Sequence, residues 1–285
     1  MTVQYASDLH LEFPENKQLF KTNPLKPMGD VLVLAGDIVP FKVMAQHADF
    51  FTYVSENFKT TYWIPGNHEY YYSDVTEKSG TFIEKIKENV SLINNNAIFL
   101  DDVKFIFSTL WSNIRPENEW HIERGMSDFK LIKNGQFHFS ASKFNELHKG
   151  CVDFLKQELA GNHTNKTVVV SHHVPTLMNF PEIYKNSGLN NAFTVELFDL
   201  IEASGPDAWI YGHSHVNTPD FSIGTTRLLT NQLGYVRNNE HTSFGNSATF
   251  YLDNTIDIQD NKPDRFTTAK YVYDEEHDHE AAEIH

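Results

Sequence analysis

The chain has 285 residues, of which 40% are hydrophobic and 21% charged, a composition typical of a soluble globular protein of one or two domains. Its 38 acidic against 23 basic residues give a formal net charge of −15, which argues against general binding of a nucleic-acid backbone. The single cysteine, Cys151, excludes an internal disulfide. Neither a signal peptide nor an apolar run of about 20 residues is apparent, so we expect a cytoplasmic protein with no membrane partner.

The first half of the chain alternates between strand and helix patterns. Strands are predicted at 2–7, 31–35 and 61–64, and amphipathic helices at 44–58 and 77–89. The run at 31–35 is apolar throughout, as expected of a strand buried on both faces. This alternation favours an α/β protein with parallel strands.

The second half continues the alternation. Strands at 97–100 and 103–110 are predicted to form a hairpin, and Ser140 is a possible N-cap for a helix at 140–159. The remaining patterns predict a strand at 167–170, a short helix at 193–203, a strand at 208–211, a hairpin at 220–229 around Gly224, and a strand at 248–258.

The segment 111–136 has no clear periodicity, and we expect a long loop that caps a functional site. It carries polar and aromatic residues, namely Trp111, Arg115, Trp120, His121, Arg124 and Asp128. Candidate site residues extend from position 8 to position 215, so we interpret residues 1–260 as one domain. Residues 261–285 are expected to form an acidic, solvated tail.

Five of the predicted strands end in side chains that can bind a metal ion: Asp8 and His10, Asp37, Asn67, His172, and His213 with His215. The carboxyl ends of parallel strands meet at one edge of a sheet, where α/β proteins bind ligands. Imidazole, carboxylate and amide oxygen together suit Mn, Fe, Zn, Co or Ni. Seven ligands are too many for one such ion but suffice for two if one carboxylate bridges them. Two ions about 3.5–4 Å apart are an arrangement used for displacement at phosphorus.

The same residues carry a family resemblance. Asp8-x-His10, Gly36-Asp37, Gly66-Asn67-His68-Glu69, Ser171-His172-His173 and Gly212-His213-x-His215 resemble the five ordered motifs of the calcineurin-like metallophosphoesterase superfamily. The resemblance covers about residues 1–230. It implies an α/β fold, a four-layer α/β/β/α sandwich with two mixed sheets, and a dinuclear metal centre.

The resemblance also implies roles for single residues. Asp8, His10 and His215 would hold one metal ion, and Asn67, His172 and His213 the other. Asp37 would bridge the two ions, and His68 would be the acid that protonates the leaving oxygen. The fourth motif leaves His172 and His173 as alternatives, and we choose His172 because it directly follows Ser171 at the end of the strand. Glu69 stands where many members have Asp.

We therefore expect a metal-dependent phosphoesterase that cleaves a small phosphodiester or phosphomonoester by attack of a metal-bridging hydroxide, with manganese as the expected metal. A binding scaffold that has lost catalysis and a nuclease are the alternatives. The expected partner is a small phosphate ester rather than a nucleic acid, and the oligomeric state is left open. Substrate contacts are assigned to Asn67, Tyr70, Arg115 and Arg124. Tyr70 could instead pack beneath the next element, and both arginines could be solvated loop residues.

Overall fold

The computed structural model describes residues 1–161, 165–185 and 187–252. Residues Met1–Leu252 form one compact unit. The expected tail at 261–285 and the end of the expected strand at 248–258 lie outside the described residues. Within the described ranges, no helix combines the length and apolar character that crossing a membrane requires.

The first of two six-stranded sheets has the order β14-β1-β2-β3-β5-β4. Its central strands run parallel, and β14 and β4 pair antiparallel at its edges. The strands are β1 (Thr2–Ala6), β2 (Val31–Ala35), β3 (Thr60–Ile64), β4 (Phe82–Lys87), β5 (Val90–Asn94) and β14 (Thr249–Tyr251). β1, β2 and β3 therefore deliver the residues that follow them to the same edge of this sheet.

The second sheet has the order β12-β13-β11-β10-β7-β6 and repeats this plan, with parallel central strands and antiparallel edges. Its strands are β6 (Asn96–Leu100), β7 (Val103–Ser108), β10 (Lys166–Ser171), β11 (Ala208–Tyr211), β12 (Phe221–Ile223) and β13 (Thr226–Thr230). The predicted hairpins at 97–110 and 220–229 are confirmed as β6–β7 and β12–β13. A bridge between Ser7 and Gln232 joins the two sheets where β1 and β13 end.

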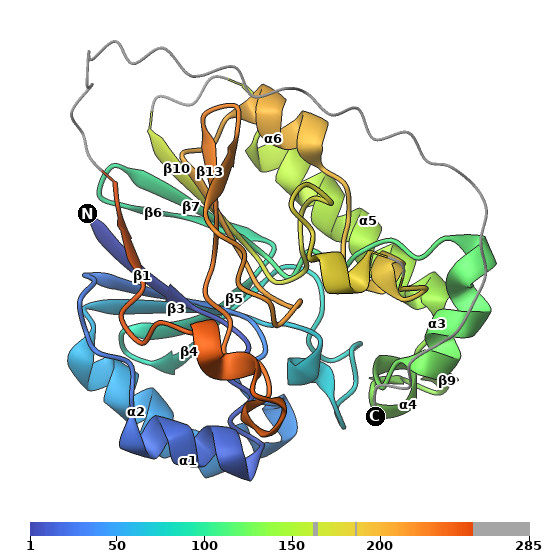
Figure 1. The fold of residues 1–285 in the computed structure, drawn as a ribbon, viewed down its shortest axis with the longest axis horizontal. Helices are drawn as coiled ribbons and strands as arrows, with labels where there is room; N and C mark the ends of the chain where they lie inside the picture. Colours follow the sequence, from blue (N-terminus) through green and yellow to red (C-terminus); the bar gives the residue numbers. More distant parts are fainter. Residues whose placement is uncertain (162–164, 186, 253–285) are drawn as a thin grey trace. The chain divides into compact units, whose positions relative to one another are not determined.

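The helices cover the outer faces of the sheets, which gives the expected four-layer α/β/β/α sandwich (Figure 1). α1 (Pro14–Thr22) and α2 (Ala48–Asn57) pack on the first sheet, and α5 (Ala141–Glu158) and α6 (Phe198–Ser204) on the second. In β2, Val33 faces the core between the sheets while Leu32 and Leu34 face the outer helices. This alternation explains why β2 is apolar throughout.

The predicted helix at 77–89 is wrong, because its central residues form β4, which pairs antiparallel with β5. The segment Phe82–Lys87 alternates between half-buried and exposed side chains, as an edge strand does. Phe82 and Ile86 pack on the outer core of the first sheet. Their spacing of four residues suits one face of a helix as well as one face of a strand, and only pairing with β5 decides between them.

The segment 111–136 is not the structureless loop that we expected. It contains α3 (Glu119–Gly125), α4 (Asp128–Leu131) and β8 (Lys133–Asn134), which pairs with β9 (Phe137–His138). Its apolar residues Ile114, Ile122, Met126 and Ile132 are buried in the core of the second sheet. These elements are too short to show a helical period in the sequence, and packing stabilises them. The helix at 140–159 is confirmed, and Ser140 caps it by accepting the Lys143 N–H at 3.3 Å.

Candidate metal centre

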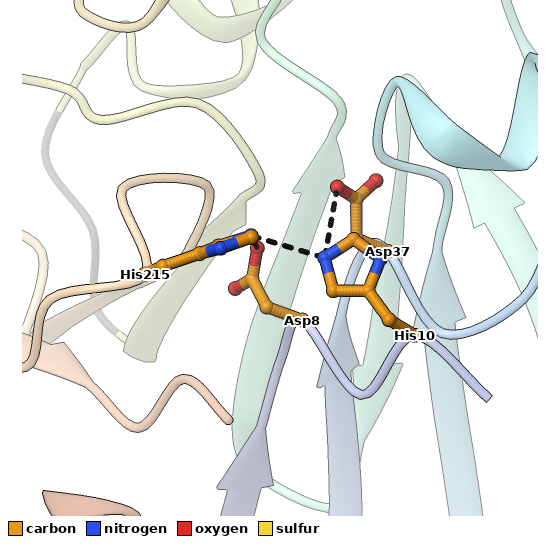
Figure 2. A group of neighbouring side chains, drawn as sticks. All are labelled: Asp8, His10, Asp37 and His215. Atoms are coloured by element: carbon orange, nitrogen blue, oxygen red, sulfur yellow. Dashed lines mark hydrogen bonds and ion pairs between the residues drawn. The ribbon is translucent and has the colours of Figure 1, made fainter. Parts of the chain in front are cut away.

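The ends of five strands converge on one site. Asp8 and His10 follow β1, Asp37 follows β2, Asn67 follows β3, His172 follows β10, and His213 and His215 follow β11. All are buried except His215, which is partly buried. Figure 2 shows how Asp8 and His10, from the loop after β1, point toward Asp37 and His215, which come from two other loops.

Five of these residues have a left-handed backbone, with φ of 56° at Asp8, 45° at His10, 55° at Asp37, 75° at His213 and 53° at His215. Residues other than glycine adopt this backbone conformation at a cost of roughly 1–2 kcal/mol each. Such strain gathers at functional sites, where the surrounding structure holds it in place. The backbone is thus bent to aim these side chains inward.

Glycines let the loops approach each other. A Cβ at Gly66 would lie 2.2 Å from Asp37 Oδ1 and 2.6 Å from His172 Nε2. A Cβ at Gly36, where φ is +89°, would lie 2.4 Å from His172 Nδ1. The glycines of the Gly36-Asp37 and Gly66-Asn67 motifs are therefore required by the space that His172 occupies.

The first group of ligand atoms comes from Asp8, His10, Asp37 and His215. His10 Nε2 lies 3.0 Å from His215 Nε2 and 3.8 Å from Asp37 Oδ2, and His215 Nε2 lies 3.5 Å from Asp8 Oδ1. The His213 N–H donates to both carboxylate oxygens of Asp8 at 3.1 Å, which holds that carboxylate in place.

The second group comes from Asp37, His172 and His213. His172 Nε2 lies 3.1 Å from His213 Nδ1 and 3.2 Å from Asn67 Oδ1, so Asn67 belongs to this group as well. Asp37 Oδ1 lies 3.4 Å from His172 Nε2. The two oxygens of Asp37 therefore face different groups, as those of a bridging carboxylate do.

The imidazole orientations fit metal ions. His10 Nδ1 faces the Glu12 carboxylate at 3.3 Å, and His215 Nδ1 faces the Glu240 carboxylate at 2.7 Å. A carboxylate only accepts, so each Nδ1 carries a proton, and the two Nε2 atoms face each other across 3.0 Å. Burial lowers the pKa of His215, but Asp8 and Glu240 outweigh it and raise the pKa to about 10, so without an ion its Nε2 holds a proton that it can donate to His10 Nε2. An ion that takes the place of this proton could be bound by both nitrogens, each at about 2.0–2.1 Å.

The electrostatics of the site also call for positive charge. Burial lowers the pKa of His172, but the charges of Asp37 and Asp8 outweigh this effect and raise it to about 9. Burial likewise opposes ionisation of Asp37, yet His172 and His68 hold its pKa well below the usual range. The residues present thus fit two metal ions in ligand type, orientation and charge.

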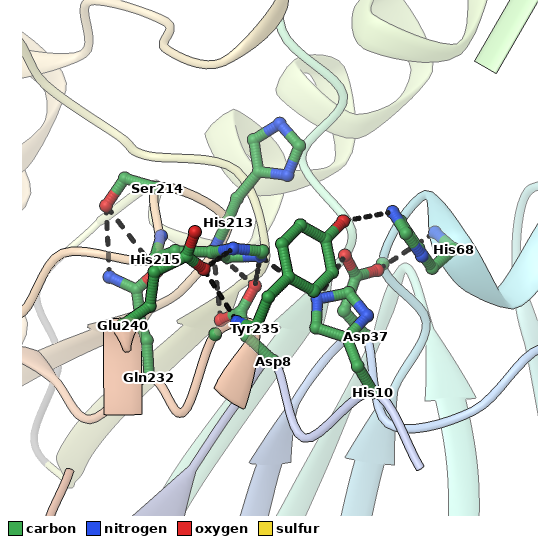
Figure 3. A network of polar contacts seen from close by, with 12 residues as sticks. Asp8, His10, Asp37, His68, His213, Ser214, His215, Gln232, Tyr235 and Glu240 are labelled. Atoms are coloured by element: carbon green, nitrogen blue, oxygen red, sulfur yellow. Dashed lines mark hydrogen bonds and ion pairs between the residues drawn. The ribbon is translucent and has the colours of Figure 1, made fainter. Parts of the chain in front are cut away.

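His68 belongs to neither of these two groups, but it forms a third cluster of possible ligand atoms with His10 and Glu12. In Figure 3 it lies beside Asp37 and faces Tyr235. Its Nδ1 faces Glu12 Oε1 at 3.2 Å, its Nε2 lies 3.3 Å from the Tyr235 hydroxyl, and its ring stacks on Tyr71 at 4.0 Å between centroids. Burial disfavours the imidazolium, but Asp37 and Glu12 outweigh it and raise the pKa of His68. His68 is therefore suited to hold a proton at Nε2.

Asp128 orients the Asn67 amide. Asn67 Nδ2 donates to Asp128 Oδ1 at 2.9 Å, and the Tyr71 hydroxyl donates to the same oxygen at 2.7 Å. Because the Asn67 amide nitrogen is held by an acceptor, its carbonyl oxygen must face His172. Asp128 is fully buried and comes from the segment 111–136, which we expected to cap the site, although no role was assigned to Asp128 itself.

Glu69 fastens the loop after β2 to the loop after β3. Its carboxylate accepts hydrogen bonds from the backbone N–H groups of Asp37 at 2.9 Å, Ile38 at 2.7 Å and Gly66 at 2.6 Å. The N–H of Val39 and the indole of Trp63 add longer bonds of 3.3 and 3.2 Å. The substitution of Glu for Asp at this position therefore serves to fix the loop that carries Asp37.

The structure brings His172 into the second group and directs His173 elsewhere. His173 Nδ1 lies 3.3 Å from the Thr109 carbonyl, and its ring packs on His213 at 4.1 Å between centroids.

Tyr70, which we assigned to substrate contact, is 1% exposed and packs against Phe41 and Trp111. This agrees with the alternative that Tyr70 packs in the core.

The two arginines assigned to substrate lie at either end of α3. Arg115 precedes the short helical turn that leads into α3. Arg124 stacks on the exposed ring of Trp120, with its Cζ 4.8 Å from the ring centroid. Nothing in this geometry directs Arg124 toward the metal-ligating groups.

The segment after β13 contributes residues that the sequence interpretation missed. Glu240 orients His215, Gln232 Oε1 accepts the His215 N–H at 2.6 Å, and Tyr235 contacts His68. Thr230-Asn231-Gln232 follows a strand just as the other motifs do, and this position after a strand was the one available signal. None of these side chains belongs to a recognisable motif.

Comparison with known proteins places this geometry in context. A family model described as calcineurin-like phosphoesterase matches residues 1–217. An uncharacterized protein, L509, of Acanthamoeba polyphaga mimivirus is 31% identical over 284 residues, which cover 89% of this chain and 98% of that protein. The crystal structure of a phosphopantetheinyl hydrolase from Mycobacterium tuberculosis has a TM-score of 0.62 at 16% identity, covering 89% of this chain and 96% of that one.

Proposed function

We propose, from the premise that the chain belongs to the calcineurin-like phosphoesterase family and is a hydrolase of phosphate esters, that it cleaves a small phosphodiester or phosphomonoester at the converging strand ends. The observation that carries this proposal is Asp37, whose two oxygens face the His10 group and the His172 group separately. Asp8, His10 and His215 would hold one ion, Asn67, His172 and His213 the other, and Asp37 would bridge them.

A pair of bound divalent ions would neutralise phosphate charge and make water a stronger nucleophile near pH 7. We propose manganese as the metal, and the mixed imidazole, carboxylate and amide ligands also suit Fe, Zn, Co and Ni. The single cysteine, Cys151, is free and buried in the core around α5, which fits the reducing cytoplasm that we propose as its location.

His68 is proposed as the proton donor to the leaving oxygen. The Nδ1–H of His68 donates a hydrogen bond to the Glu12 carboxylate, so Nε2 is the nitrogen that can release a proton to the substrate. Stacking on Tyr71 fixes the plane of the ring. A general acid of this kind contributes roughly 10²–10⁴-fold to the rate.

The substrate is proposed to be compact, with a diester slightly preferred over a monoester. A net charge of −15 repels long polyanions such as DNA, whereas a single phosphate needs only the local positive charge of the metal ions. No partner other than this substrate is required by the site.

The test compares kcat/KM for bis(p-nitrophenyl) phosphate, cyclic nucleotides, nucleoside monophosphates and single-stranded DNA at physiological salt with Mn²⁺. We expect a small ester to be cleaved best. His68→Gln should keep both ions and lose most rate on substrates with poor leaving groups, which need a proton. Fastest cleavage of DNA would favour a nuclease, and no cleavage of any ester by protein with two ions bound would favour a binding scaffold.

A further inference from the structure

The segment that follows β13 is fixed directly to the loops that carry the metal ligands. The Leu233 and Gly234 N–H groups donate to the carbonyls of Ser7 and Asp8, each at 3.1 Å. From the other side, Asn16 of α1 accepts the Val236 N–H at 3.2 Å. The position of this segment relative to Asp8 and His10 is therefore set by backbone hydrogen bonds.

Tyr235 forms a wall of the site. Its ring centroid lies 4.5 Å from that of His215 and 4.8 Å from that of His10, and its hydroxyl reaches His68 Nε2 (Figure 3). The Tyr235 N–H donates to Glu240, the carboxylate that orients His215. One tyrosine thus contacts two proposed metal ligands and the proposed acid.

Arg237 packs against the ring of Tyr235 and is itself exposed. Its guanidinium carbon is 5.4 Å from the Tyr235 ring centroid and 5.1 Å from that of Phe13. Among the residues that the structure describes, no carboxylate forms an ion pair with Arg237, whereas Arg227 pairs with Asp220 at 3.3 Å. The nearby Glu240 is already engaged by His215, Tyr235 and Asn238.

An arginine whose guanidinium packs against aromatic rings keeps its N–H donors free for a planar or tetrahedral oxyanion. The rings of Phe13 and Tyr235 stand at 85° to each other, and Arg237 contacts both.

We propose that Arg237, held by Tyr235 and Phe13, is a second anion subsite, and that the substrate is a small phosphate ester bearing a second oxyanion, either phosphate or carboxylate. The inference rests on the proposed function, because the scissile phosphate would bind at the metal ions while the second group binds Arg237. Tyr235 links the two positions, because its ring contacts His10 and His215 and lies 5.4 Å from the guanidinium carbon of Arg237.

The experiment measures binding calorimetrically with three non-hydrolysable probes on the full-length, Mn²⁺-loaded protein. Propylphosphonate carries one anionic group, propane-1,3-diyl bisphosphonate carries two phosphonates, and 3-phosphonopropanoate carries a phosphonate and a carboxylate. We expect at least one of the doubly anionic probes to bind about 10-fold more tightly than propylphosphonate, as one charge-assisted hydrogen-bonded contact would give. The better of the two identifies the second group as phosphate or carboxylate.

Arg237→Ala should reduce this preference to about 1, and Arg237→Lys should keep part of it. The matched control is Arg227→Ala, which removes another exposed arginine lying over a ring, that of Phe250 at 6.0 Å, and should leave the preference unchanged. The bisphosphonate could also remove metal ions from the protein, an effect that would not depend on Arg237. The metal content of the protein, measured after each titration, shows whether ions were removed.

Equal binding of the three probes to the wild-type protein, or a preference that Arg237→Ala retains, would overturn the inference. Hydrolysis of bis(p-nitrophenyl) phosphate, measured in the same preparations, reports on the proposed function separately. Hydrolysis without a preference for two anions would leave the proposed function standing and the subsite refuted. An Arg237-dependent preference without hydrolysis would support the subsite as an anion-binding site and contradict the catalytic proposal.

Discussion

Each of three imidazoles in the site is oriented by an acceptor on its outer nitrogen: Glu12 for His10, Glu240 for His215 and the Ala35 carbonyl for His172. The inner nitrogen of each ring thereby faces the centre and can bind an ion once it has lost its proton. Metal-ligating histidines in proteins are commonly held in this way. The orientation of the ligands is thus decided by residues that would not touch an ion themselves.

Asp37→Asn should cost the protein both metal ions, because each Asp37 oxygen faces a different group. We expect metal content to fall from near two ions per chain to below one, and activity to fall by more than the roughly 10–100-fold that loss of an outer partner costs. Elemental analysis after gel filtration measures the content. The exposed Asp199→Asn is the control, and an Asp37→Asn protein with two ions and full activity would refute the bridging role.

Asp128→Asn should weaken only the second group. An amide at position 128 can present either a donor or an acceptor to Asn67, so the Asn67 carbonyl is no longer forced toward His172. We expect affinity for one of the two ions to fall roughly 10–100-fold. Titration of metal-free protein with Mn²⁺ measures both affinities. Tyr71→Phe, which leaves the bond between Asn67 and Asp128 intact, should have a smaller effect, and the reverse order would contradict this account.

At the scale of elements, the site depends on how the ends of β2 and β3 are joined. Glu69 gathers N–H donors from the loops after both strands, and it is fully buried. Burial and the charge of Asp37 raise the pKa of Glu69 to about 8, while the N–H donors from both loops favour its ionised form. The two loops can therefore move apart only if several buried donors lose their acceptor.

Glu69→Gln should destabilise the protein by about 1–3 kcal/mol, because the amide nitrogen would face N–H groups that need an acceptor. It should also weaken metal binding, since the loop that it holds carries Asp37. Ser140→Ala removes the N-cap of α5 at a cost of about 1 kcal/mol and serves as the control. Urea unfolding and Mn²⁺ titration of both variants should show a stability loss in each, and a metal-binding loss in Glu69→Gln alone.

At the scale of the whole molecule, the site joins the two sheets, because its residues follow β1, β2 and β3 of one sheet and β10 and β11 of the other. The ligand atoms of each group lie within 4.8 Å of one another, and they come from segments that only folding brings together. Ions bound only by the folded state should therefore stabilise the fold as a unit.

Addition of Mn²⁺ to chelator-treated protein should raise the free energy of unfolding, by about 2.7 kcal/mol per site at a free ion concentration of 100 times Kd. Urea unfolding with and without Mn²⁺ measures the change. The Asp37→Asn protein should show little of it, and an equal gain in that variant would mean that the ions stabilise the fold from elsewhere.

The sequence by itself determined where most of the strands lie and which of them are followed by side chains that can bind a metal ion. The apolar run of β2, the strand at 60–64 and the hairpins at 97–110 and 220–229 were predictable, because buried strands and turns depend on a few neighbouring residues. Asp8, His10, Asp37, Asn67, His172, His213 and His215 were proposed as ligands because each follows a strand, and parallel strands deliver their carboxyl ends to a common edge.

Only the tertiary structure decided the rest. β4 was taken for a helix because its amphipathic spacing fits both periods until β5 pairs with it. Asp128, Tyr235 and Glu240 follow no motif, and they reach the site through the packing of α4 and of the segment after β13. A ligand near a strand end is encoded locally by its position in the chain. The residues that orient it come from distant segments, which only the folded chain brings within hydrogen-bonding distance.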